Sequence, residues 1–256
     1  EMRNVLETIT PERARELLAR SARNRKISLS WVKLLAMIIV EGRWEVSHQG
    51  IALDARGFLI DGQHRLMAII EADRAVEMYV AYGMPRRSML VIDSGARRTD
   101  LAAFRIAGHD EITSPFISCA RMMIPGAETA LSGRHRGASI DRQTLLAFIR
   151  QHSDAIAFAL ENLGKSGLGS AAVLAVIARA YYTVNHAKLK RFCEILEDGY
   201  IRDETESAAA RLREVLLRMY GRHGDRQGRI TRYQKTQRAL EAFVDGEYVW
   251  IPWESL

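Results

Sequence analysis

The sequence has little cysteine and no long hydrophobic run. Its two cysteines, Cys119 and Cys193, lie far apart in apolar surroundings, which favours buried free thiols over a disulfide and fits a reducing compartment. The longest apolar run, residues 31–40, contains Lys33 and is far shorter than the ~20 residues that cross a bilayer. The polar start, Glu1-Met2-Arg3-Asn4, has no signal-peptide pattern. We therefore expect a soluble cytoplasmic protein.

Two common kinds of site are missing as well. The seven histidines are scattered and the cysteines are distant, so no zinc-ligand spacing emerges. Gly164-Lys165-Ser166 has the end of a Walker-type phosphate loop, but Ala159 stands where its first glycine belongs. This stretch is interpreted as the end of one helix and the start of the next.

The composition is that of a globular protein with an excess of positive charge. Hydrophobic residues make up 48% of the chain, so a sizeable core is available and global disorder is excluded. The formal net charge is +6 and the sequence pI is about 9.5. Such a balance suits an anionic partner, which by charge alone can be nucleic acid, a nucleotide or an acidic membrane face.

Helical and strand patterns alternate in the first hundred residues. Thr10 and Pro11 predict a helix start, and that helix is expected to end near Asn24; a second helix is expected over Trp31–Glu41. The short strands expected here are residues 45–46, 51–54, 58–60, 76–82 and 88–92. Together they predict a small α/β domain with a mixed sheet, spanning residues 1–100.

Strand signals almost vanish after residue 100, and amphipathic helical patterns replace them. The expected helices are residues 114–123, 141–162, 170–185, 188–197, 204–220 and 232–244. The predicted fold class is therefore α+β, with an all-helical domain over residues 101–256.

One stretch stands out, Phe58 to Ile70, because a polar turn separates two apolar runs. Its centre is Asp61-Gly62-Gln63-His64-Arg65, which we call the Asp61–Arg65 turn. Strand, tight turn and helix are the predicted order, with Gly62 at the corner. Backbone N–H groups at the start of a helix favour an anion, and an arginine can hold a phosphate through two parallel hydrogen bonds. The alternative is that Asp61 only caps the helix while His64 and Arg65 face solvent.

The sequence IDGQHRL resembles the phosphate-binding motif of the ParB/sulfiredoxin superfamily, in the form carried by DGQHR-type proteins. A wider pattern is similar to phage and actinobacterial ParB-like proteins: Gly42-Arg43-Trp44, then residues 50–54, then residues 93–99. The resemblance covers about the first hundred residues. It implies a ParB/sulfiredoxin-like domain that binds ATP or another nucleoside triphosphate with Mg²⁺, in a bacterial or phage-infected cell.

The resemblance also implies roles for the residues of the turn. Gly62, Gln63, His64 and Arg65 would hold phosphate, and Asp61 would orient the turn or bind the metal ion. His64 would either carry a proton or donate to phosphate. The superfamily uses this loop for hydrolysis, for phosphoryl transfer and for binding alone, so the motif does not fix the chemistry.

Further candidates lie before and after the turn. Phosphoryl transfer needs a carboxylate that positions magnesium or takes a proton, and Glu41 and Asp54 are the expected catalytic acids. Each has a plain alternative: Glu41 can end a helix and Asp54 can form a turn. Arg43 is expected to join the nucleotide site, and Trp44 can stack on a base or belong to the core.

A second polar loop follows the expected strand at residues 88–92. Asp93 is a candidate metal ligand, and Arg97 and Arg98 are candidate phosphate or nucleotide contacts. The alternative is a surface turn with a solvated arginine pair.

The stretch from residue 218 to residue 238 is strongly basic, with glycines and tyrosines between the charges. A flexible basic segment with aromatic residues suits a nucleic-acid backbone and encodes no base specificity. The alternative is a solvated loop and helix face. The candidate contacts are Arg222, Arg226, Arg229, Arg232, Tyr233 and Lys235.

The leading prediction is a nucleotide-using enzyme that works on or near DNA. It would hydrolyse a nucleoside triphosphate or transfer a phosphoryl group, with a modified DNA base or nucleotide as one acceptor that the resemblance suggests. Two alternatives remain open: a DNA-binding regulator of DNA modification without turnover, as DndB-like relatives are, and a ParB-like nuclease. The nuclease needs Glu41, Asp54, Asp61 and Asp93 to converge on two metal ions.

Overall fold

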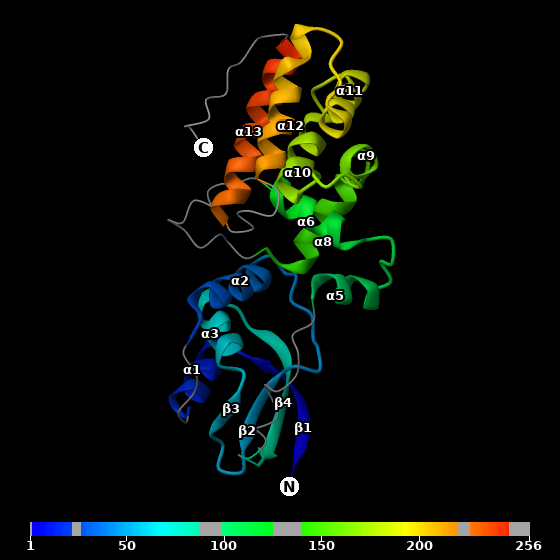
Figure 1. Ribbon diagram of the computed structural model, residues 1–256. Helices are drawn as coiled ribbons and strands as arrows, with labels where there is room; N and C mark the ends of the chain where they lie inside the picture. Colours follow the sequence, from blue (N-terminus) through cyan, green and yellow to red (C-terminus); the bar gives the residue numbers. More distant parts are fainter. Residues whose placement is uncertain are drawn as a thin grey trace. The chain divides into compact units, whose positions relative to one another are not determined.

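The chain forms two compact units in the computed structural model (Figure 1). The structure describes residues 2–21, 27–85, 87, 99–124, 140–219 and 226–245. Unit 1 comprises Glu1–Arg97 with Ala138–Ile140, and unit 2 comprises Arg98–Gly137 with Asp141–Leu256. A small mixed sheet with many helices confirms the predicted α+β class. Among the described helices, none combines the length and apolar character that a membrane crossing requires.

Unit 1 contains a four-stranded mixed sheet. Its strands are β1 (Arg3–Ile9), β2 (Ile51–Asp54), β3 (Leu59–Asp61) and β4 (Val76–Met84), in the order β1-β4-β2-β3. β4 lies between β1, which is antiparallel to it, and β2, which is parallel; β3 closes a hairpin with β2. The parallel pair requires a crossover, and helix α3 provides it.

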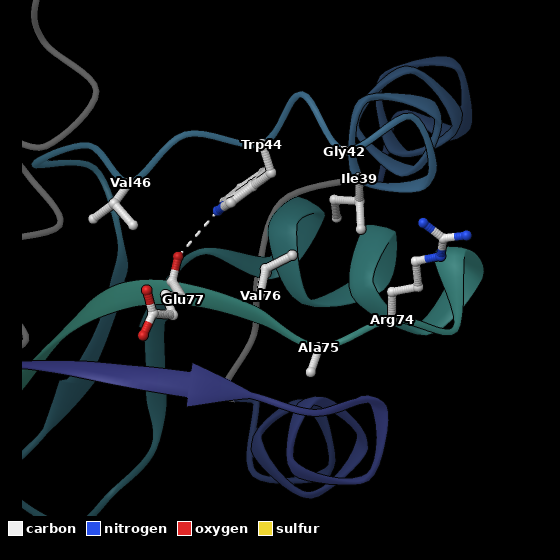
Figure 2. A pocket seen from close by; sticks show the side chains of 8 residues that line it. All are labelled: Ile39, Gly42, Trp44, Val46, Arg74, Ala75, Val76 and Glu77. Atoms are coloured by element: carbon white, nitrogen blue, oxygen red, sulfur yellow. Dashed lines mark hydrogen bonds between the residues drawn. The ribbon is translucent and has the colours of Figure 1, made fainter.

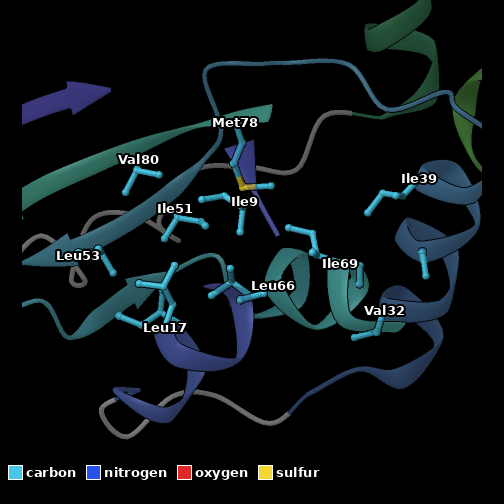
Figure 3. Close-up of a cluster of buried hydrophobic side chains, with 14 residues drawn as sticks. Ile9, Leu17, Val32, Ile39, Ile51, Leu53, Leu66, Ile69, Met78 and Val80 are labelled. Atoms are coloured by element: carbon cyan, nitrogen blue, oxygen red, sulfur yellow. The ribbon is translucent and has the colours of Figure 1, made fainter. Parts of the chain in front are cut away.

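Three helices of unit 1 share one core with the sheet: α1 (Pro11–Ala19), α2 (Leu29–Val40) and α3 (Gln63–Ala72). Alternate residues of β4 face this core, as expected for a strand with one covered face: Met78 and Val80 are buried, and Val76 and Tyr82 are partly buried. Figure 3 shows the two buried side chains in one cluster with Leu66 and Ile69 of α3 and Val32 of α2.

Helices α2 and α3 lie side by side and run in the same direction. At their starts, the backbone N–H of Ser28 donates to Nε2 of His64 at 3.0 Å. At their ends, Nη1 of Arg74, which follows α3, donates to the carbonyl of Val40 at 2.8 Å. The two N-termini therefore lie together at one end of the pair.

Unit 2 is helical throughout its described residues. Helix α10 (Ala171–Ala180) packs against α6, α9 and α13, and its sequence AAVLAVIARA is apolar nearly all round, as expected for a central helix. The other elements are α5 (Asp100–Ile106), α6 (Ser114–Met123), α8 (Arg142–Gln151), α9 (Ser153–Leu163), α11 (His186–Asp198), the 3₁₀ turn η2 (Glu204–Glu206), α12 (Ser207–Arg218) and α13 (Arg226–Asp245).

Several predicted elements are confirmed. The strand at residues 51–54, the end of α3 at Ala72 and the helix at residues 114–123 agree with the sequence patterns. Thr10 caps α1 as predicted, because its hydroxyl accepts from the N–H of Arg13 at 3.2 Å.

Other predicted elements are wrong. The helix that starts at Pro11 ends at Ala19 rather than near Asn24, and residues 45–46 form no strand. The pattern over residues 141–162 divides into α8 and α9 at His152, whose φ of −114° breaks the helix. β1 was missed, because the charges of Arg3 and Glu7 obscure the alternation of an edge strand. The strand expected at residues 88–92 lies outside the described residues.

Glu206 provides a test of how unit 2 is held together. Its carboxylate accepts from Nε and Nη2 of Arg191 at 2.9 and 2.8 Å and from the N–H of Arg202 at 2.8 Å. The hydrogen bonds from Arg191 outweigh the effect of burial and lower the pKa of Glu206 to about 2. A carboxyl whose pKa is depressed on folding stabilises the fold above its ordinary pKa of about 4.5 and loses that contribution as pH falls toward 2.

We expect Glu206→Gln to lower the free energy of unfolding by about 3 kcal/mol at pH 7 and to flatten its pH dependence between about 4.5 and 2. Chemical denaturation across this pH range measures both effects. Glu204→Gln, at an exposed position of the same turn, is the control and should change little. Equal losses from the two substitutions would contradict the role given to Glu206.

Candidate functional site

The Asp61–Arg65 turn is a strand–turn–helix corner, as the sequence predicts. β3 ends at Asp61, and α3 begins at Gln63. Gly62 between them has φ +106° and ψ 7°, a left-handed conformation that favours glycine. A Cβ atom at Gly62 would lie 3.1 Å from Cγ1 and 3.2 Å from Cα of Ile51. Both the conformation and the space at this corner therefore favour glycine.

The side chain of Asp61 bonds to the residue that precedes α3. Its Oδ1 accepts from the N–H of Gly62 at 2.7 Å, and its Oδ2 lies 3.8 Å from Nη1 of Arg65. The side chain is 42% exposed. The N-cap position of α3 is Gly62 and no side chain caps it, so the alternative in which Asp61 caps the helix is wrong; the carboxylate of Asp61 stays accessible from solvent.

Arg65 is engaged inside unit 1 rather than extended into solvent. Nη1 donates to the carbonyl of Gly50 at 2.7 Å, and Nη2 reaches Oε1 of Gln49 at 3.5 Å. Gly50 itself lies against β4, where a Cβ atom would be 1.7 Å from the carbonyl oxygen of Tyr79. Because a guanidinium has five N–H donors, these bonds leave some for a ligand. Arg65 therefore ties α3 to the segment that enters β2.

His64 joins the starts of α2 and α3. An Nε2 that accepts from the N–H of Ser28 carries no proton, so the ring proton of the neutral form is assigned to Nδ1. This bond satisfies one of the N–H groups that a helix start leaves without an intrahelical partner. In this arrangement Nε2 cannot donate to phosphate, and protonation at Nε2 requires the ring to leave Ser28.

Gln63 has an unusual position at the start of α3. Its Oε1 is buried and has no hydrogen-bond partner within the described part of the chain. Buried acceptors of this kind are uncommon in native proteins. Gln63 lies at the turn, as the motif predicts, but without a partner that defines its role.

Glu41 and Arg43 do not lie at the turn. Glu41 follows the last residue of α2, and both Nε and Nη2 of Arg43 donate to its Oε2, at 2.7 and 2.6 Å. Twelve helical residues span ~18 Å, and it is the other end of α2 that meets His64. The prediction that Glu41 and Arg43 join the nucleotide site is therefore wrong in this structure.

Asp54 is also placed differently from the prediction of a catalytic acid. It is 7% exposed, and its Oδ1 accepts from the N–H groups of Arg56 and Phe58 at 2.8 and 2.9 Å. These bonds close the turn of the β2–β3 hairpin, whereas Asp61 lies at the open end of the same hairpin. The alternative, in which Asp54 forms a turn, is what the structure has.

The second polar loop contributes nothing that can be placed. Asp93, Arg97 and Arg98 lie outside the described residues. Within the residues that are described, no group of three or more His, Cys, Asp or Glu side chains could hold a metal ion. Of the two predicted metal ligands, Asp61 is therefore the one with a known environment.

A shallow hollow of about 320 Å³ lies at the other end of the α2–α3 pair (Figure 2). Its walls include Ile39, Val76 and Arg74, with Trp44 beside Glu77. Nε1 of Trp44 donates to the carbonyl of Glu77 at 3.0 Å, and the ring packs against the core of unit 1. Trp44 is thus a structural residue, and the hollow is not part of the Asp61–Arg65 turn.

Two of the predicted nucleic-acid contacts on α13 are buried rather than on its surface. Tyr233 is 3% exposed and its hydroxyl accepts from Nη1 of Arg179 at 2.5 Å. Lys235 is 6% exposed, and burial, with a smaller effect of the charge of Arg238, lowers its pKa. Arg232 is half-buried and donates to the carbonyl of Met219 at 3.0 Å. Tyr233 and Lys235 are therefore wrong as surface contacts.

The remaining basic residues do not form one stripe. Arg229 is exposed, and so is Arg238, which is not among the predicted contacts. They are nine residues apart, so they project from opposite sides of α13. Arg222 lies outside the described residues, and Arg226 opens α13 with its side chain not described. The covered face of α13 carries the buried residues Tyr233, Thr236 and Leu240. Their spacing of three and four residues could have indicated this face from the sequence.

The corner at Gly62 can be tested against a matched glycine. Gly57 also has a left-handed φ, +78°, but a Cβ atom there would meet little besides the side chain of Arg20 at 3.8 Å. We expect Gly57→Ala to lower the free energy of unfolding by about 1–2 kcal/mol, which is the conformational cost alone. Gly62→Ala should cost roughly 1–3 kcal/mol more, because its methyl group meets Ile51.

Urea unfolding of both variants measures the difference. Equal losses of unfolding free energy in the two variants would mean that Ile51 moves aside and that the corner tolerates a larger residue.

No family model, no curated protein and no solved structure matches the chain. The likeness of IDGQHRL to the ParB/sulfiredoxin motif therefore remains a resemblance of one stretch. The function has to be inferred from the side chains of the turn and their surroundings.

Proposed function

We propose that unit 1 binds a nucleoside triphosphate, with its phosphates at the Asp61–Arg65 turn. The observation that carries this proposal is the hydrogen bond between Ser28 and His64, which holds the N-termini of two parallel helices together. Each N-terminus carries a partial positive charge and N–H groups directed outward. Two of them side by side favour an anion more than one does.

The side chains of the turn suit a phosphate that comes with a magnesium ion. Arg65 is 19% exposed and keeps donors beyond those bound to Gly50 and Gln49. Asp61 would repel a bare phosphate, but Mg²⁺ is commonly held by one or two carboxylates together with phosphate oxygens. The accessible carboxylate of Asp61 fits that donor set. The ion would neutralise phosphate charge and polarise the group that is transferred.

Catalysis would depend on few residues of this chain. Of the four proposed catalytic side chains, Asp61 and His64 lie at the turn, whereas Glu41 and Asp54 are engaged elsewhere. Asp61 could accept a proton from an attacking hydroxyl or water, and His64 could do so after leaving Ser28. We propose hydrolysis of the nucleotide or transfer of its phosphoryl group, on or near DNA, as the reaction.

One observation favours a second candidate, a DNA-binding regulator without turnover. Asp54 and Glu41 have structural partners, so the described residues place fewer acids at the turn than a phosphotransferase site is expected to assemble. A regulator needs only the phosphate-binding corner and the net positive charge of the chain. We do not propose the nuclease, because the three of its carboxylates that the structure describes do not converge. Glu41 follows the end of α2, Asp54 closes the turn of the β2–β3 hairpin, and Asp61 lies at the open end of that hairpin.

We expect wild-type protein to bind at least one nucleoside triphosphate in the presence of Mg²⁺, measured by isothermal titration calorimetry. Arg65→Ala should weaken this binding about tenfold or more, because it removes charge-assisted hydrogen bonds to phosphate. Arg74→Ala is the matched control: Arg74 makes the same kind of bond to a backbone carbonyl, at the other end of the α2–α3 pair.

The control should lose a similar amount of thermal stability and keep its affinity. No heat with any triphosphate, or equal losses of affinity in both variants, would contradict the proposal.

Product analysis separates the enzyme from the regulator. We expect incubation with a triphosphate and Mg²⁺, with and without DNA, to release phosphate or to label the DNA. Asp61→Asn should abolish either product, because an amide neither accepts the proton nor holds the ion as a carboxylate does. Tight retention of DNA without any product would support the regulator, and shortened strands would support the nuclease.

A further inference from the structure

Strand β1 leaves an open edge on the sheet of unit 1. It pairs with β4 from Arg3, opposite Tyr82, to Ile9, opposite Val76. Within the described residues no strand pairs with its other side. Arg3, Leu6 and several of their neighbours are exposed, so no described residue covers their side chains. The N–H and C=O groups along such an edge are a template for another strand.

β1 carries two charges, Arg3 and Glu7, but lacks other usual means of protecting an edge strand. It has seven residues, contains neither proline nor glycine, and keeps one register with β4 without a bulge. β3, the strand at the opposite edge, has three residues and is bridged by Ser21. On the sheet face away from the helices, Leu6 is 46% exposed and pairs with Tyr79 of β4. Of the two edge strands, β1 is therefore the one better suited to pair with a further strand.

The side chains of β1 are complementary in charge to those of a second β1 that runs antiparallel to it. If two copies meet antiparallel with Val5 opposite Val5, then Arg3 lies opposite Glu7 and Glu7 opposite Arg3. Leu6 then lies diagonal to its counterpart on the other face. Glu7 accepts from the hydroxyl of Tyr82 at 2.6 Å through Oε1, and a carboxylate can accept further bonds.

We propose that β1 docks onto β1 of a second copy of this chain and forms a two-fold symmetric dimer with a continuous sheet. The pairing is isologous, because the same residues serve both sides and opposite charges meet twice. A single strand pair buries less surface than a permanent interface, so the dimer is weak and forms in a concentration-dependent way. The pairing does not depend on nucleotide binding.

A disulfide across the two-fold axis tests the register directly. Opposed residues of an antiparallel pair have Cα atoms about 4.5–5.5 Å apart, which suits a disulfide. Val5→Cys should therefore give a covalent dimer under mild oxidation of the full chain. Thr8→Cys is the control, since its counterpart would be roughly 20 Å away. Cys119 and Cys193 are buried thiols whose pKa burial raises to about 12, so they should not compete.

Charge reversal tests the ion pairs. We expect sedimentation velocity to show a wild-type dimer at high concentration, and Arg3→Glu and Glu7→Arg each to raise the dissociation constant about tenfold or more. Mixing the two variants should restore the dimer, because each then supplies the charge that the other lacks. Arg15→Glu, an exposed reversal on α1, is the control and should dimerise as wild type does.

A wild-type chain that stays monomeric at every concentration would overturn the proposal. So would equal cross-linking through positions 5 and 8, or charge variants that dimerise as well as wild type. Circular dichroism establishes that each variant is folded before its dimerisation is compared with that of wild type.

Discussion

The parallel packing of α2 and α3 is the constraint on which the candidate site depends. Two aligned helices place like partial charges side by side, which is unfavourable unless burial of apolar surface outweighs it. Val32 and Ile39 of α2 and Leu66 and Ile69 of α3 supply that surface and are almost fully buried. The core therefore holds the two N-termini together, and the positive pole that results is where we propose that the phosphates bind.

Several polar residues of unit 1 form hydrogen bonds to backbone groups. This explains why some of the predicted site residues have a structural role. Asp54 is needed where the hairpin turns, because the N–H groups of Arg56 and Phe58 have no partner in a strand there. Arg65 is needed where Gly50 passes close to β4. A side chain that bonds to the backbone can still contact a ligand, but only through donors or acceptors that the backbone does not use.

The sequence predicts local features of the fold well and contacts between distant residues poorly. The cap at Thr10, the corner at Gly62 and the strand at residues 51–54 depend on neighbours in the chain, and the structure has them. The bond between Ser28 and His64 joins residues 36 apart, and no periodicity marks it. Lys235 was misplaced for a related reason: a basic residue is expected outside, and only the packing of α13 buries it.

The two proposed sites belong to opposite edges of one sheet. In the order β1-β4-β2-β3, the Asp61–Arg65 turn continues from β3, whereas the proposed pairing uses β1, with β4 and β2 between them. A dimer formed through β1 would therefore carry its two turns at the outer ends of an eight-stranded sheet. Neither copy would cover the turn of the other, so two ligands could bind to one dimer without competing for space.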